Sequence, residues 1–227
     1  MATLSCKTSA ILPRLPDTLS ARLFRSAASR RLEAGEALFL AGDPGDGCYR
    51  LEQGLLKLVI TSPRGEERIL TMLGPGALVG ELAMIDGLPR SCSVFAVRGC
   101  ELSFISRAEF GECTRQHPEI YRYLVNVLAA RLRETDEGVA AASFLPVRAR
   151  VARALIALGE YLGEADDAGR VVIHYKITHG DLAAVAGVAR ENVSRVMSDW
   201  KRCKVVTRSA GHYCLNAVAT LRRNLAP

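Results

Sequence analysis

The chain has 227 residues, of which 49% are hydrophobic and 24% charged, as is ordinary for a globular protein with room for two domains. No apolar run reaches the length of a membrane-spanning helix, and the first residues lack the apolar core of a secretory signal, so a cytoplasmic location is expected. Residues 146–227 hold 13 Lys and Arg against 7 Asp and Glu, whereas residues 1–145 hold 17 of each. The net charge of +6 therefore lies in the last third, which indicates a polyanionic partner there unless the surface charge is random.

The first predicted element is a short amphipathic helix over residues 17–31. Leu19, Leu23 and Phe24 recur at helical spacing after Asp17, a residue type that caps helix starts. Residues 32–108 then change to short apolar runs that end at turn signals, among them Gly42, Gly54, Gly65, Gly74 and Gly99. Short strands separated by such turns at roughly 10 to 12 residues predict an antiparallel barrel or jelly roll.

One segment, residues 79–94, interrupts this rhythm. The residues after Gly80 predict about one helical turn, which Gly87 closes. Free N–H groups at a helix start and the guanidinium of Arg90 can both point at one phosphate, so the segment predicts an anion site. Glu81 would suit a ligand that also carries a hydroxyl donor. A surface ion pair of Glu81 with Arg90, worth less than about 1 kcal/mol, is the alternative.

Residues 118–145 predict one long helix with a heptad seam, formed by Tyr121, Val125, Leu128, Leu132, Thr135, Val139 and Ala142. Charged residues lie off the seam and predict a solvated face, namely Arg122, Arg131, Arg133, Glu134, Asp136 and Glu137. The seam would pack either on its own domain or on a partner helix in a dimer. Leu145-Pro146 is the expected break after this helix.

The remaining chain predicts a winged helix-turn-helix. Residues 148–163 carry Val151, Leu155 and Leu158 on one helical face, and residues 171–176 alternate as a strand. Residues 177–202 predict two helices joined by a tight turn at Gly187, with Ala183 small at the crossing and Val193 and Val196 packing the second helix onto the first. Residues 204–216 predict a closing hairpin. A three-helix module that binds protein is the alternative.

The second of these helices carries candidate base-reading residues. Arginine can bond guanine O6 and N7 together, and glutamate can accept from cytosine N4, so Arg190, Glu191 and Arg195 are predicted to contact bases in the major groove. Contacts to the DNA backbone are predicted for Thr178, His179 and Asn192.

The string Gly80-Glu81-Leu82-Ala83, followed by Pro89-Arg90-Ser91 and Ser93-Val94, resembles the phosphate-binding cassette of cyclic-nucleotide-binding domains. From about residue 15 to its end the chain resembles the Crp/Fnr family of transcription regulators, whose reading helix shares the Arg-Glu-x-x-x-Arg pattern. This resemblance implies an α+β fold in three parts. They are a cyclic-nucleotide-binding β-roll (jelly roll) with an N-terminal helix over 1–116, a dimerisation helix over 117–145 and a winged helix-turn-helix DNA-binding domain over 146–227.

The resemblance also implies roles for individual residues. Within the cassette, which includes Gly80 and Leu82, Glu81 would accept from the ribose 2′-OH, Arg90 would pair with the cyclic phosphate and Ser91 would add a hydroxyl. Thr135 and Asp136 match two residues that touch the base, but Asp136 stands where members that bind cyclic AMP carry serine. Because guanine offers N1–H and N2–H₂ side by side, a carboxylate at Asp136 would relax the preference towards cyclic GMP. Asp136 as an ordinary solvated acid is the alternative.

The expected function is that of a homodimeric regulator, not an enzyme, that binds a 3′,5′-cyclic nucleotide and a palindromic TGTGA-like operator. Cyclic AMP is the favoured ligand and cyclic GMP is the second candidate. The implied partners are double-stranded DNA, a second copy of the chain and RNA polymerase. A family member that does not respond to cyclic nucleotides remains the alternative. No metal is expected, because the seven cysteines form no CxxC pair, Cys6 stands alone near the N-terminus and no histidine lies between residues 30 and 110. These absences disfavour iron-sulfur, haem and cupin-type metalloenzyme readings, and the helix-turn-helix disfavours a kinase or channel module.

Overall fold

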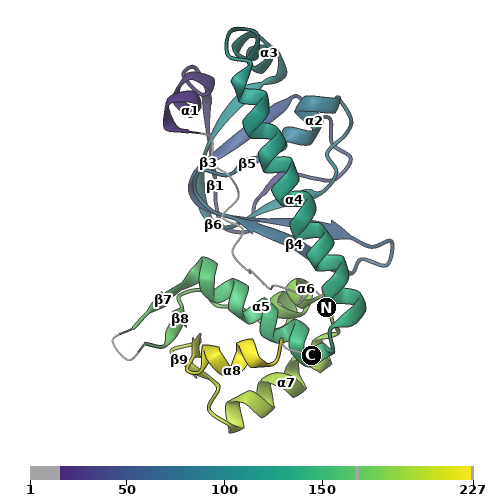
Figure 1. The fold of residues 1–227 in the computed structure, drawn as a ribbon, viewed down its shortest axis with the longest axis vertical. Helices are drawn as coiled ribbons and strands as arrows, with labels where there is room; N and C mark the ends of the chain where they lie inside the picture. The colour runs from purple at the N-terminus through teal and green to yellow at the C-terminus, as the bar shows by residue number, and fades with distance from the viewer. Residues whose placement is uncertain (1–15, 167–168, 226–227) are drawn as a thin grey trace. The chain divides into compact units, whose positions relative to one another are not determined.

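The computed structural model describes residues 16–166 and 169–225 (Figure 1). These residues divide into two compact units, one ending at Thr135 and the other beginning at Asp136, and each is described by itself. The boundary falls inside one long helix, α4 (Glu119–Phe144), which therefore contributes to both units. No helix in the described part of the chain is long and apolar enough to cross a membrane.

The first unit is built on an antiparallel sheet in the order β1-β6-β3-β4, with β2 paired to β6 and β5 paired to β3. Its strands are β1 (Ala28–Leu32), β2 (Ala37–Phe39), β3 (Gly47–Thr61), β4 (Glu67–Leu73), β5 (Leu78–Val79) and β6 (Ser93–Ser106). Leu51, Leu56, Val94 and Leu102 are almost fully buried in the main hydrophobic cluster of this unit. The predicted N-terminal β-roll is confirmed.

The helix predicted over residues 17–31 is shorter in the structure. α1 (Asp17–Leu23) follows Pro16 and has no side-chain cap, so the prediction that Asp17 caps it is wrong. Ala28–Leu32 forms β1 because it pairs along its length with β6. Strand pairing therefore overrides the weak helical spacing after Leu23.

Two of the predicted turns lie within strands. Gly54 is an interior residue of β3 and Gly99 is an interior residue of β6, where the pairing of the two strands shifts register. Gly54 has a φ of +106°, and a Cβ there would collide with the carbonyl oxygen of Gly99. These glycines thus permit a close, bulged approach of two long strands rather than a reversal of the chain.

The first unit has two further short helices before α4. The predicted helical turn after Gly80 is present as α2 (Glu81–Asp86). α3 (Arg107–Gln116) begins with a capping box in which Ser106 accepts from the backbone of Glu109 and the Glu109 carboxylate accepts from the backbone of Ser106. Figure 1 shows α2 and α4 together on one side of the β-roll.

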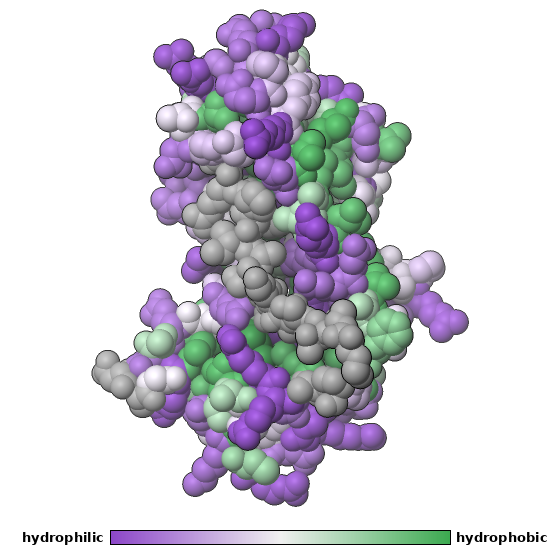
Figure 2. All heavy atoms as spheres, viewed as in Figure 1, coloured by the Kyte–Doolittle hydropathy of each residue, from purple (hydrophilic) through white to green (hydrophobic). Residues whose placement is uncertain are grey.

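α4 presents two different faces. Ile120 and Leu124 are buried in the cluster that also holds α1, so this face packs on the first unit. Four residues of the predicted seam are 50% to 62% exposed: Tyr121, Val125, Leu132 and Val139. Figure 2 shows hydrophobic side chains gathered on the side of the β-roll where α2 and α4 lie. Because α4 uses other residues to pack on its own unit, the heptad is left facing outward.

The second unit continues from α4 through α5 (Val147–Leu162), α6 (His179–Ala186), α7 (Arg190–Arg202) and α8 (Val218–Arg223). A small antiparallel sheet has the order β7-β8-β10-β9, with β7 (Gly163–Ala165), β8 (Val171–Ile173), β9 (Val206–Ser209) and β10 (His212–Leu215). The helix pair α6–α7 followed by the β9–β10 hairpin confirms the predicted winged helix-turn-helix. β7 and α8 were not predicted, because both are short and lack a strong apolar period.

Candidate functional site: a buried anion pocket and an exposed reading helix

The pocket begins at Gly80, the residue before α2. Its backbone is left-handed, with a φ of +83°, and a Cβ there would collide with the Nη1 atom of Arg90. The left-handed conformation therefore favours glycine, and a side chain at this position would displace the Arg90 guanidinium. Gly80 brings α2 and the guanidinium of Arg90 together at one end of the sheet.

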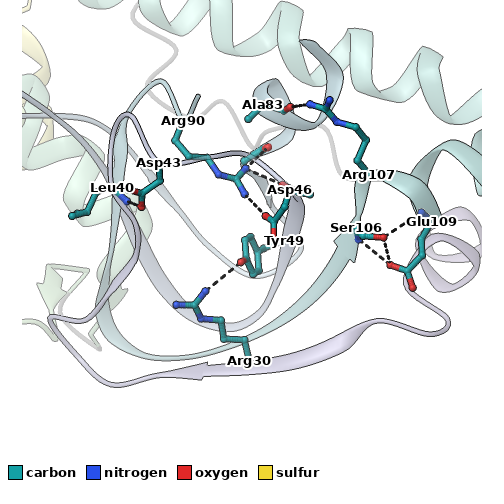
Figure 3. Close-up of polar contacts among 12 residues, drawn as sticks. Arg30, Leu40, Asp43, Asp46, Tyr49, Ala83, Arg90, Ser106, Arg107 and Glu109 are labelled. Carbon is teal, nitrogen blue, oxygen red and sulfur yellow. Dashed lines mark hydrogen bonds and ion pairs between the residues drawn. The ribbon is translucent and has the colours of Figure 1, made fainter. Parts of the chain in front are cut away.

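Arg90 is only 4% exposed, and several contacts hold its guanidinium in place. Its Nη1 donates to the carbonyl oxygens of Gly47 and Gly80, each at 2.8 Å, and its Nη2 lies 3.3 Å from Asp46 Oδ1 (Figure 3). The guanidinium also stacks over the ring of Phe39, 4.4 Å from the centroid. Nε has no hydrogen-bond partner among the described residues. Since Asp46 is largely exposed, this buried cation suits an additional anion.

Glu81 follows Gly80, whose carbonyl oxygen accepts from Arg90, and is only 1% exposed. The Oε1 atom of Glu81 accepts from Nη1 of Arg131 on α4. The Nη2 atom of Arg131 donates to the carbonyl oxygen of Leu78. The second carboxylate oxygen, Oε2, has no partner within the described part of the chain. An unpartnered buried acceptor costs about 1–3 kcal/mol, so Oε2 is suited to a donor on a ligand.

Packing behind α2 fixes the position of the pocket. Arg107 at the start of α3 donates through Nη2 to the carbonyl of Ala83, and its backbone N–H donates to Asp46 at 2.9 Å (Figure 3). A Cβ at Gly45 would collide with the Ala83 side chain, so the loop before β3 can pack this closely on α2 only with glycine. Movement of α2 is thus tied to α3 and to the loop that carries Asp46.

Two thiols near the pocket remain neutral. Burial is the main cause that raises the pKa of both Cys48 and Cys92, with a smaller contribution from the nearby Glu81 carboxylate. Neutral buried thiols are poor nucleophiles and poor metal ligands. In residues 16–166 and 169–225 no three His, Cys, Asp or Glu side chains gather in a way that could hold a metal ion.

The reading helix α7 presents its predicted residues to solvent. Gly187 takes the left-handed conformation, with φ of +61°, and ends α6, so that the chain can turn into α7. Val193, Val196, Met197 and Trp200 form its buried face. Arg190, Glu191 and Arg195 are exposed, and Glu191 and Arg195 are one turn apart.

Thr178 and His179 are committed to contacts within this unit. Thr178 caps α6: its Oγ1 accepts from Asp181 N at 3.0 Å and donates to the Asp181 carboxylate at 2.7 Å. His179 Nδ1 lies 2.9 Å from Ser194 Oγ on α7. Burial, and then the charges of Arg208 and Arg190, lower the pKa of His179, so its ring is neutral at pH 7. His179 therefore links α6 to α7, whereas Thr178 caps the start of α6.

The comparisons with known proteins match the two parts of the chain that hold these candidate sites. Residues 29–117 match the cyclic nucleotide-binding domain, and residues 149–223 match the Crp-like helix-turn-helix domain. The cyclic AMP receptor protein of Thermus thermophilus is 38% identical over 164 residues, which cover 72% of each chain. The chain belongs to the Crp/Fnr family of transcription regulators.

Solved structures of Crp/Fnr regulators share this fold. One from Thermus thermophilus has a TM-score of 0.75 at 26% identity and covers 87% of this chain and 98% of its own. The c-di-GMP responsive global regulator of Xanthomonas campestris has a TM-score of 0.76 at 22% identity, covering 88% and 99%. This Crp/Fnr protein is accordingly a DNA-binding transcription regulator with a cyclic nucleotide-binding domain.

The structure brings some of the predicted pocket residues together and leaves others outside. Gly80 and Arg90 are joined by a hydrogen bond and Glu81 is buried at the next position, whereas Leu82 is 42% exposed and Ser91 is exposed. Thr135 is exposed, and its Oγ1 donates to the carbonyl of Arg131 at 2.9 Å. Among the predicted DNA contacts, Asn192 is half-buried on α7. Asp136 is exposed on α4.

Arg131 is the candidate site residue that sequence reasoning missed. The prediction placed it on the solvated face of the long helix, but its side chain is only 17% exposed because it pairs with Glu81. The available signal was its position one turn before Thr135, which puts both on adjoining turns of α4. Fifty residues separate Arg131 from Glu81, so local spacing could not reveal the pair.

Proposed function

We propose that this Crp/Fnr protein is a homodimer whose binding to DNA is controlled by a 3′,5′-cyclic nucleotide. The observation that carries the proposal is the buried pair of Arg90 and Glu81, each with a polar atom that lacks a partner among the described residues. A cyclic nucleotide carries a partner for each of these side chains: its phosphate is an anion for Arg90, and its ribose 2′-OH is a donor for Glu81. A simple inorganic anion would satisfy only the first.

In this proposal the rest of the ligand contacts the remaining predicted residues. Ser91 adds a hydroxyl beside the phosphate, and Gly80 and Leu82 line the cassette. Thr135 and Asp136 contact the base. Cyclic AMP is the favoured ligand because relatives with this domain pairing are named for it, as is the Thermus thermophilus protein. Cyclic GMP is the second candidate because of the carboxylate at position 136.

The second copy of the chain would pack on the exposed heptad of α4. Tyr121, Val125, Leu132 and Val139 repeat at coiled-coil spacing and lie open to solvent in the protomer. Contiguous exposed apolar surface of this kind marks an interaction site. An identical α4 is the occupant that presents the same repeat, and it would give a two-fold symmetric dimer. Residues 1–116, 117–145 and 146–227 would then act as sensing, dimerisation and DNA-binding parts.

The two α7 helices of such a dimer would read a palindrome of TGTGA-like half-sites about one DNA turn apart. Arg190, Glu191 and Arg195 would contact base edges, with Asn192 and the N-terminus of α6 at Thr178 and His179 near the phosphates. RNA polymerase is the proposed protein partner once the dimer is bound to DNA. The basic second unit supplies the long-range attraction to DNA.

Arg195→Ala tests DNA reading. Arg195 is exposed, so we expect the variant to fold normally and to bind the operator more weakly by about 1–3 kcal/mol, with relaxed preference at one base position. Fluorescence anisotropy with the operator and with single-base variants at fixed salt measures both effects. Arg170→Ala, on the β7–β8 hairpin, is the matched control. Equal loss on scrambled DNA would show that Arg195 contacts only phosphate.

Asp136→Ser tests ligand preference. If the Asp136 carboxylate accepts from the guanine N1–H and N2–H₂ groups, its replacement should raise the ratio of the cyclic GMP Kd to the cyclic AMP Kd by about tenfold, the worth of one charge-assisted hydrogen bond. Calorimetric titration with each nucleotide measures the ratio. Glu112→Gln, on the exposed face of α3, controls for the loss of an acidic charge. An unchanged ratio of the two Kd values would show that Asp136 does not contact the base and is an ordinary solvated acid.

One observation favours a second candidate, a family member that responds to a different signal. Glu81 Oε1 is already occupied by Arg131, and the serine of cyclic AMP-binding members is replaced at Asp136. A solved neighbour with the same fold is described as c-di-GMP responsive. Titration with c-di-GMP beside the two cyclic mononucleotides separates the candidates, since only one class should bind in an Arg90-dependent way.

A further inference from the structure

Three arginines of α5 contact four other parts of the second unit. Arg153 contacts the end of α4, Arg150 contacts the turn between α6 and α7, and Arg148 contacts α7 and α8. Arg150 and Arg153, three residues apart, lie on adjoining parts of one face of α5, whereas Arg148 lies on another face because residues two and five apart do not share one. α5 is therefore linked by polar contacts both to the helix before it and to the reading helix.

The contact of Arg153 with Glu137 has two parts. Arg153 Nη1 donates to the backbone carbonyl of Glu137 at 3.0 Å, and Nη2 lies 3.6 Å from the Glu137 carboxylate. The Arg153 side chain is 20% exposed and that of Glu137 40% exposed. A carbonyl oxygen has two lone pairs, so this one can accept from Arg153 in addition to its helical partner. The planar guanidinium joins backbone and side chain at once and fixes the angle between the helices.

The covalent connection at this corner is short. The N–H of Leu145 still donates to Ala141 at 3.1 Å, and the N–H of Arg150 already donates to Pro146 at 3.1 Å, so helical bonding stops and restarts across Leu145 and Pro146. Pro146 has a φ of −64°, which its ring enforces. A short link and a lateral clamp together make the α4–α5 corner a stiff joint.

From α5 the contacts continue to the reading helix. Arg150 donates through Nε to the carbonyl of Ala186 at 3.1 Å and through Nη2 to that of Gly187, at the turn before α7. Arg148 Nη1 lies 3.4 Å from Asp199 Oδ2, and its guanidinium stacks over Trp200, 5.1 Å from the ring centroid. Both ends of α7 are thus held from α5.

We infer that Arg153 is a positioning residue that couples the end of α4 to the orientation of α7. The inference rests on the proposed function, in which Thr135 and Asp136 contact the base, because Glu137 is the next residue on the same helix. A ligand that fixes this turn of α4 fixes Glu137, and the Arg153 clamp passes the constraint to α5. Arg150 and Arg148 then carry it to the two ends of α7.

The test compares Arg153→Gln with the wild-type dimer. Operator Kd is measured by anisotropy without nucleotide and with saturating cyclic AMP or cyclic GMP, and nucleotide Kd is measured by calorimetry. The wild-type ratio of the two operator Kd values is the coupling factor, expected at about 5 to 150. In Arg153→Gln the coupling factor should fall at least about fivefold, while the nucleotide still binds. If the wild-type coupling factor is itself below about five, it should fall to 1. Arg222→Gln, which removes an exposed ion pair between α8 and Glu160 of α5, should leave the factor unchanged.

The outcomes distinguish a failure of the role of Arg153 from a failure of the proposed function. An unchanged factor in Arg153→Gln, with the wild-type protein still gated, overturns the role of Arg153 and leaves the proposed function standing. A wild-type factor of 1 overturns the proposed function and the inference with it. If Arg153→Gln does not fold, Glu137→Gln replaces it: this variant keeps the backbone bond, removes the ion pair and should lower the factor by a smaller amount. An unchanged factor in Glu137→Gln would then overturn the inference.

Discussion

Arg90→Ala is expected to weaken cyclic nucleotide binding by at least about 100-fold, and calorimetric titration with cyclic AMP and cyclic GMP measures the loss. Arg90 is 4% exposed, and its Nε has no hydrogen-bond partner in the described part of the chain, so a bound phosphate would supply one. Each charge-assisted hydrogen bond to a phosphate contributes about 1.5–3 kcal/mol, so the loss of a forked pair removes about 3 kcal/mol or more. The same effect is expected for both nucleotides, because the cyclic phosphate is common to them.

Two companion variants separate binding from folding. Arg31→Ala removes an exposed arginine of β1 that pairs with Glu101, so it should bind both nucleotides as the wild-type protein does. Arg90→Lys retains the charge and loses the fork, and it should bind with intermediate affinity. Wild-type affinity in a folded Arg90→Ala variant would show that the pocket is not the nucleotide site.

Leu132→Glu is expected to convert the dimer into a monomer, as measured by sedimentation velocity or light scattering at micromolar concentration. Leu132 is 62% exposed on the seam of α4, so the change should leave the folded protomer intact. In the dimer it would place two carboxylates in an apolar interface, and burying unpaired charge costs several kcal/mol. Operator affinity should fall at least about 100-fold as well, because the two half-sites would no longer be bound by linked α7 helices.

The matched control for this prediction is Arg133→Glu, the neighbouring exposed position on the same turn but off the seam. It should remain dimeric at the same protein concentration. If Leu132→Glu stays dimeric with unchanged operator affinity, the heptad of α4 is not the dimer interface, and another surface must join the protomers.

The elements that could be predicted from sequence are those with a strong local signal. The α4 heptad could be predicted because its apolar period is sustained over several turns. The ends of α2 and the turn before α7 could be predicted because Gly80, Gly87 and Gly187 take the left-handed backbone conformation that favours glycine. The errors arose where long-range pairing decided the outcome. β1 formed in place of the second half of a helix, and Gly54 marked a bulge within β3 because β6 runs beside it.

The candidate site divides in the same way. Glu81 and Arg90 could be predicted because they lie within one short string of residues. Arg131 could not, since a solvated arginine and a pocket arginine have the same pattern on a helix, and only the fold brings Arg131 to Glu81. The contact of His179 with Ser194 was also hidden, because it depends on how α6 meets α7. The cap at Thr178 is local, because Thr178 and Asp181 form a Thr-x-x-Asp capping box at the start of α6.

The most direct test of the central claim is the affinity of the wild-type protein for a duplex with two TGTGA half-sites, measured by anisotropy at one salt concentration. The duplex is titrated without nucleotide, with saturating cyclic AMP and with saturating cyclic GMP. The account predicts a Kd lower by a factor of about 5 to 150 with at least one of the nucleotides, and no such change in Arg90→Ala. The same Kd with and without either nucleotide would contradict it.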